Sequence, residues 1–106
     1  MARPTSIETA VTATSTSWIP LNHHASDFGI RYVVAKTGTG DRTYSVQGTI
    51  SDILDGATAV VFDLVSAITA NQIDRTETEP LTGIRLTTTA GSGAATMALT
   101  VLQQDA

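Results

Sequence analysis

His23 and His24 are the side chains best suited to chemistry near neutral pH, because an unperturbed imidazole titrates there. Together with Asp27 they could offer a metal ion two nitrogens and a carboxylate oxygen. Neighbouring residues of a strand point to opposite faces, however, and no further ligand follows at a useful spacing. The pattern therefore favours surface histidines in a polar loop over a metal site or a general base.

A glycine-rich segment at residues 37–41, with the sequence TGTGD, could in principle cradle a phosphate group. It lacks the Gly-Lys-Ser/Thr ending of a phosphate-binding loop, and a strand pattern follows it where a helix would be needed. We therefore predict a hairpin turn at this position and no nucleotide cofactor.

The carboxylates of Asp52, Asp55 and Asp63 are close in the sequence, and paired carboxylates can act as general acid and base. That role needs a cleft in which one pKa is shifted, and no flanking pattern indicates one. Capping and turn formation are the simpler duties of these residues. With no cysteine and no catalytic motif, the sequence predicts a protein that is not an enzyme and holds no metal or cofactor.

Composition limits the partners of this 106-residue chain, which has the length of one domain. Charged residues make up 15%, the net charge is −4, and the arginines are spread singly, which argues against nucleic acid. No apolar run is long enough for a membrane span, and the first residues do not resemble a signal peptide. We therefore expect no membrane association and synthesis in the cytoplasm.

The last quarter of the chain, residues 80–104, has the clearest β pattern. Ile84, Leu86 and Thr88 alternate with polar residues, and after a Gly-Ser-Gly turn at 91–93 the apolar positions are Met97, Leu99 and Val101. Two runs of period two joined by a short glycine turn predict an antiparallel hairpin with one apolar face.

The preceding residues carry weaker patterns of the same kind. We predict strands over 6–16, 28–36 and 42–51, the last with Tyr44, Val46 and Ile50 on its buried face. Residues 57–71 fit a helix or a strand, and β-branched residues favour a strand over 59–65. Residues 72–79 read as a polar turn, and Trp18 as a core residue in preference to an interface anchor.

This pattern predicts an all-β fold. Turn signals recur at intervals of roughly 8–12 residues and separate about six to eight short strands. We expect a single antiparallel β-sandwich, jelly-roll-like, or a small barrel. Residues 1–5 form an N-terminal arm, and residues 6–106 form the single β domain.

Three runs resemble small β-rich structural proteins of tailed-bacteriophage virions. They are residues 39–47 (TGDRTYSVQ), residues 50–63, and residues 84–103, from IRLTTTA to ATMALTVLQ. Together they cover about two thirds of the chain, and the pattern is a β pattern with fixed polar positions. Val61 and Phe62 stand where these proteins usually have Trp-Phe.

The resemblance implies a capsid decoration or cement protein on the exterior of the virion. Its partner would be the major capsid protein, with self-association as a dimer or trimer, and the alternative is a minor head–tail connector or tail component. The expected contacts come from the arm, the polar loops at 22–27 and 72–79, and an unpaired strand edge. The candidate contact residues are Met1, Ala2, Arg3, Pro4, Thr5, His23, His24, Arg31 and Arg85.

Overall fold

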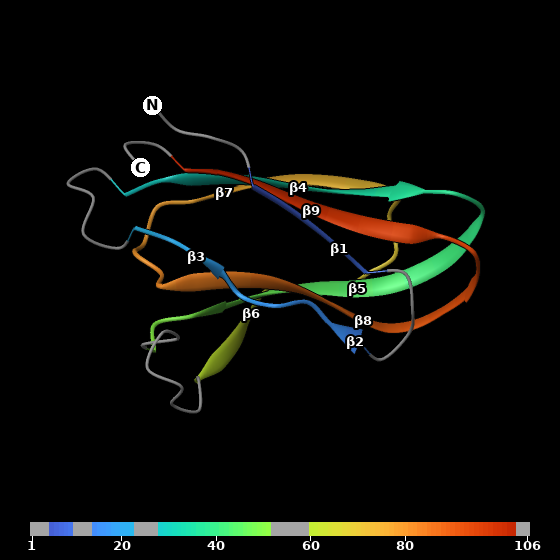
Figure 1. The fold of residues 1–106 in the computed structure, drawn as a ribbon, viewed down its shortest axis with the longest axis horizontal. Coiled ribbons are helices and arrows are strands. Elements are labelled where there is room, and N and C mark those ends of the chain that lie inside the picture. The colour runs from blue at the N-terminus through green and yellow to red at the C-terminus, as the bar shows by residue number, and fades with distance from the viewer. Residues whose placement is uncertain (1–4, 10–13, 23–27, 52–59, 104–106) are drawn as a thin grey trace.

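Runs of alternating apolar and polar residues, rich in threonine and valine, form the strands of this protein (Figure 1). The computed structural model describes residues 5–9, 14–22, 28–51 and 60–103. The described residues form nine strands: β1 (Thr5–Thr9), β2 (Thr14–Ser15), β3 (Ile19–Pro20), β4 (Ile30–Thr37), β5 (Gly40–Thr49), β6 (Val61–Ile68), β7 (Gln72–Glu77), β8 (Gly83–Gly93) and β9 (Thr96–Gln103).

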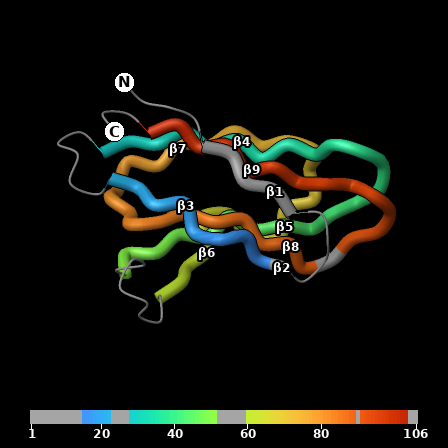
Figure 2. Tube along the Cα trace, in the orientation of Figure 1, coloured from blue at the N-terminus to red at the C-terminus, as the bar shows by residue number. Residues whose placement is uncertain are grey.

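These strands make two antiparallel sheets that face each other (Figures 1 and 2). Sheet A has the order β1-β9-β4-β7, and sheet B has the order β2-β8-β5-β6 with β3 also paired to β8. Among the described strands no pairing joins one sheet to the other, so the fold is a sandwich and the barrel alternative is wrong. The predicted all-β sandwich is confirmed.

The strand order is that of a jelly roll. The first half of the chain runs against the second half, since β1 pairs with β9, β2 and β3 pair with β8, β4 with β7, and β5 with β6. Two further pairings, β4 with β9 and β5 with β8, roll this long hairpin into two sheets.

The core lies between the sheets and consists of the inward positions of the alternating runs. The predicted inward residues of the last quarter, Ile84, Leu86, Thr88, Met97, Leu99 and Val101, are all buried. Tyr32 and Val34 of β4 and Tyr44 and Val46 of β5 are also buried between the sheets, as their spacing predicts. The Tyr44 hydroxyl donates to the carbonyl of Ala70 at 2.8 Å, and burial raises the pKa of this phenol.

Two predicted hairpins are wrong, because both connections cross between the sheets. β4 belongs to sheet A and β5 to sheet B, so residues 37–41 do not join paired strands. In the same way β8 lies in sheet B and β9 in sheet A, and β8 continues through Gly93. The two crossings lie side by side at one end of the sandwich (Figure 1), where the Ala94 amide donates to the Thr39 carbonyl at 2.8 Å.

Arg42 and Lys36 hold these crossings together. The buried Arg42 guanidinium donates through Nη1 to the carbonyls of Asp41 (2.9 Å) and Ser92 (3.0 Å), and through Nη2 to the carbonyl of Gly93 (3.1 Å). Lys36 Nζ donates to the Gly40 carbonyl at 2.9 Å. Gly40 has a φ of 117°, and a Cβ there would collide with the Ser92 carbonyl oxygen, so the close approach requires glycine.

Several predicted elements have different bounds in the structure. Residues 6–16 do not form one strand, because β1 pairs in sheet A and β2 in sheet B. Thr5 belongs to β1, opposite Val101, and therefore not to an arm. The ambiguous segment is a strand as predicted, but it runs to Ile68 as β6. Residues 72–77 are not a turn but β7, an edge strand paired with β4.

Two side chains also differ from expectation. Ile50 follows the last residue of β5 and is 65% exposed, since the inward alternation ends with that strand. Trp18 is half-buried and is not part of the core, because it lies just before β3 and stacks against Arg85. The aspartates 52 and 55, together with Asp27, lie outside the described residues.

The Arg42 contacts generate a stability prediction. Arg42→Met keeps the aliphatic stem but removes all donors to the three carbonyls, so we expect a loss of about 2 kcal/mol of unfolding free energy. The measurement is the urea midpoint of unfolding at constant slope. Arg31→Met is the matched control, because the ion pair of Arg31 is exposed to solvent and screened. Equal midpoint shifts in the two variants would contradict a structural role for the Arg42 contacts.

Candidate functional site

Of the predicted contact residues, the structure describes the side chains of Arg31 and Arg85. Residues 1–4 and the histidines 23 and 24 lie outside the described residues. Arg31 alternates with the buried residues of β4, and Arg85 alternates with those of β8, so each points outward from its own sheet. The two arginines therefore lie on opposite faces of the sandwich, and a flat partner could contact one of them at a time.

Arg31 is paired with Asp74 of the neighbouring strand β7. Its Nε donates to Oδ1 at 3.0 Å and its Nη2 to Oδ2 at 2.5 Å, which is a two-pronged contact between side chains 63% and 44% exposed. Hydrogen bonding by the Arg31 guanidinium, together with its charge, lowers the pKa of the Asp74 carboxyl, and the charge of Arg75 adds to this.

Arg85 takes part in a polar row across the outer face of sheet B. Its guanidinium lies 4.5 Å from the centre of the Trp18 ring, and its Nε donates to Gln47 Oε1 at 2.8 Å. Gln47 Nε2 in turn donates to Asp63 Oδ1 at 3.1 Å. One face of the indole is therefore covered, and Tyr32 and Tyr44 are buried.

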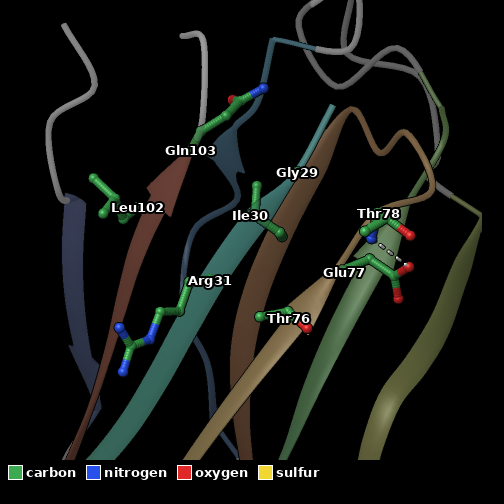
Figure 3. A pocket seen from close by; sticks show the side chains of 8 residues that line it. All are labelled: Gly29, Ile30, Arg31, Thr76, Glu77, Thr78, Leu102 and Gln103. Atoms are coloured by element: carbon green, nitrogen blue, oxygen red, sulfur yellow. Dashed lines mark hydrogen bonds between the residues drawn. The ribbon is translucent and has the colours of Figure 1, made fainter. Parts of the chain in front are cut away.

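A hollow of about 510 Å³ lies at the end of sheet A (Figure 3). It is lined by Gly29, Ile30, Arg31, Thr76, Glu77, Thr78, Leu102 and Gln103. Two of its polar side chains, Arg31 and Gln103, have partners within the chain. Arg31 binds Asp74, and the Gln103 amide exchanges hydrogen bonds of 2.8 and 2.7 Å with the main chain of Asn22.

A second hollow, which we call the seam groove, lies between the edge strands of the two sheets. It has a volume of about 260 Å³ and is lined by Ile50, Phe62, Leu64, Glu77, Glu79, Pro80 and Leu81. Gly48 lies beneath two of its apolar residues, since a Cβ there would lie 3.3 Å from both Phe62 and Leu81. Two carboxylates stand on its rim, and among the described residues that line it there is no lysine or arginine.

Hydrogen bonds fix the walls of the seam groove. Glu77 Oε1 accepts from the amides of Thr78 and Glu79, both at 3.1 Å, which orders the turn after β7. Thr82 ties the next residues to the end of β5, since its amide donates to the Thr49 carbonyl at 2.9 Å. On the opposite side, the Val60 amide donates to Ser51 Oγ at 2.8 Å and anchors the start of β6.

Sequence reasoning missed the seam groove, because it placed Ile50 in the core and treated residues 72–79 as a turn. One signal was available: Phe62 and Leu64 alternate with Asp63 in a strand-forming run, so they belong to one apolar face. The residues that pack against that face come from the opposite sheet, and the sequence alone does not show which residues they are.

The described residues contain no group of three or more His, Cys, Asp or Glu side chains arranged to hold a metal ion. Within the same part of the chain, no helix has the length and apolar character needed to cross a membrane.

Comparisons with known proteins add little. No family model matches the chain, and no curated protein matches it. Among solved structures, the fold is similar to a protein described as a Bacillus endospore appendage from a novel family of disulfide-linked pili. The identity is 13% and the TM-score 0.48, with 99% of this chain and 87% of that chain covered. A likeness of this size carries no argument about function.

The Arg31–Asp74 pair generates a pH prediction. Because the pKa of Asp74 is lowered in the folded protein, the pair favours folding above the unfolded pKa, and this contribution disappears as pH falls through the folded pKa. Arg31→Gln should raise the pKa of Asp74 towards its ordinary value, with Arg75 still lowering it. Carboxyl NMR titration measures this shift. Arg85→Gln is the control, and a similar Asp74 shift in that variant would rule out the direct pairing as the cause.

Proposed function

We propose that this protein is a structural component of a tailed-bacteriophage particle, without enzymatic activity. In this role it is a decoration or cement protein, which binds the outer surface of the major capsid protein lattice and stabilises the expanded shell. The proposal rests on the resemblance of three sequence runs and on one feature of the surface.

Two of the three resembling runs coincide with inner strands of the sandwich, and the third, residues 50–63, includes the start of the edge strand β6. Residues 39–47 lie largely in β5, and residues 84–103 span most of β8 and all of β9. β5 and β8 are inner strands of sheet B, and β9 is an inner strand of sheet A. The resemblance therefore covers three inner strands and the start of one edge strand, β6.

The surface feature that carries the proposal is an exposed apolar cluster at one side of the sandwich. Ile50 is 65% exposed, Val60 66%, Val61 38% and Phe62 39%, and all lie at the end of β5 or the start of β6. Large apolar side chains gathered in this way are typical of a surface that packs against another protein. A chain that lies on a capsid shell needs such a surface.

The mechanism follows from linkage. A protein that binds the expanded shell, and not its open or unexpanded form, stabilises the expanded shell by the free energy of binding. Many copies on one lattice make modest individual contacts collectively large. Self-association of neighbouring copies, as a dimer or trimer, would add to this effect.

The test is the number of copies in purified virions, measured by quantitative mass spectrometry, and the survival of particles that lack the protein after heat and osmotic shock. We expect a copy number that follows the capsid lattice, with weaker shells in the deletion, because the binding energy is then lost at every site. Adding back the purified protein is the control and should restore survival.

Other outcomes would redirect or end the proposal. A copy number matching a single ring at one vertex would favour the alternative, a minor head–tail connector or tail component. Absence of the protein from virions would refute a role in the particle.

A further inference from the structure

The two sheets have four edge strands, and β6 is the longest of them, with register shifts in its pairing with β5. β7 carries Asp74, Arg75 and Glu77 in six residues, and charges of this kind discourage strand addition. β1 is five residues long and includes Glu8, and β2 has two residues. β6 has eight residues without Lys or Pro, and its single charge, Asp63, is bound by Gln47 of β5. Among the described residues β6 pairs with β5 alone.

Next to this free edge lies the seam groove, which can receive side chains. A strand added to β6 places alternate side chains on the inner side, towards Phe62 and Leu64. Phe62 is exposed and Leu64 is half-buried, so both retain apolar surface for an incoming residue. The edge and the groove together form a site for an extended segment with apolar residues at alternate positions.

The negative charge around the seam groove favours a partner segment with basic residues. Glu77 and Glu79 stand on the rim of the groove, and the whole chain has a net charge of −4. The described cations are engaged inside the chain: Lys36 and Arg42 bind main-chain carbonyls, Arg31 binds Asp74, Arg75 binds the Asp74 carbonyl, and Arg85 binds Gln47. A second copy would bring its own acidic rim, and like charges oppose that pairing.

We propose that β6 and the seam groove bind an extended segment of a different protein by strand addition. The segment carries apolar residues at alternate positions and Lys or Arg residues facing Glu77 and Glu79. This inference rests on the proposed function in one respect: it assigns that segment to the capsid protein.

The test uses the whole chain, labelled with ¹⁵N, and a synthetic peptide of alternating Val and Thr with Lys at both ends. A peptide with Glu in place of Lys is the matched probe. We expect the Lys peptide to shift and protect the amides of β6, with an affinity about tenfold above that of the Glu peptide. Equal affinity of the two peptides would overturn the charge argument, and no change at β6 with either would overturn the site.

Variants locate the binding. Phe62→Ser should weaken binding of the Lys peptide about tenfold, which corresponds to about 1.4 kcal/mol. Leu102→Ser is its control, because Leu102 is 44% exposed and does not line the groove. Glu77→Gln with Glu79→Gln should reduce the preference for Lys over Glu, whereas Asp41→Asn, at the far crossing, should not. Equal effects of variants and controls would overturn the assignment.

Two further results would assign the site to another occupant and overturn the proposal. Shifts of the β6 amides with protein concentration alone, together with a dimer in analytical ultracentrifugation, would identify a second copy. Loss of β6 protection in the free protein on Ile53→Ser with Leu54→Ser would identify the chain's own segment. Peptide binding is independent of the virion copy number, so the failure of this inference and the failure of the proposed function are distinguishable.

Discussion

Arg42 donates to the carbonyls of Asp41, Ser92 and Gly93, and in this way it joins the two segments that cross between the sheets. Asp41, Ser92 and Gly93 lie in the last pairs of the β5–β8 ladder, where buried polar groups need hydrogen-bond partners. One guanidinium has five N–H groups in a fixed plane, so a single side chain can serve several carbonyls at once. At this end of the sandwich β5 pairs with β8 in sheet B, and β4 pairs with β9 in sheet A. The Arg42 contacts constrain the ends of β5 and β8 to meet at the point where the chain crosses to sheet A.

This constraint also explains what the sequence could and could not predict. Period-two alternation gives the face of each residue, and the inward positions Ile84, Leu86, Met97 and Leu99 were predicted correctly. It does not give the pairing partner. The Gly-Ser-Gly run at 91–93 has the composition of a hairpin turn, but its strand continues into a crossing held by Arg42. A hairpin turn and a crossing between sheets have the same composition. Which of the two forms therefore depends on contacts between residues far apart in the sequence.

The same holds for the candidate site: the sequence predicts which face a residue lies on, but not which residue it contacts. Arg31 and Arg85 were expected at the surface, and alternation places them there, but their partners come from other strands. Asp74 meets Arg31 across a strand pair that the sequence does not reveal, and Trp18 meets Arg85 through β3 pairing with β8. The seam groove is built from residues on three separate segments around Gly48, so no local pattern could have indicated it.

The distribution of charge connects the fold to its surface. A chain with six basic residues places Lys36 and Arg42 on main-chain carbonyls at the crossings, where the fold requires donors. Sheet A protects its β7 edge with three charges, whereas β6 has one charge, which is bound within its own sheet. An edge without such protection favours aggregation unless something pairs with it. The exposed apolar residues of β6 and the carboxylates on the opposite rim are the two sides of the surface that we propose binds a partner segment.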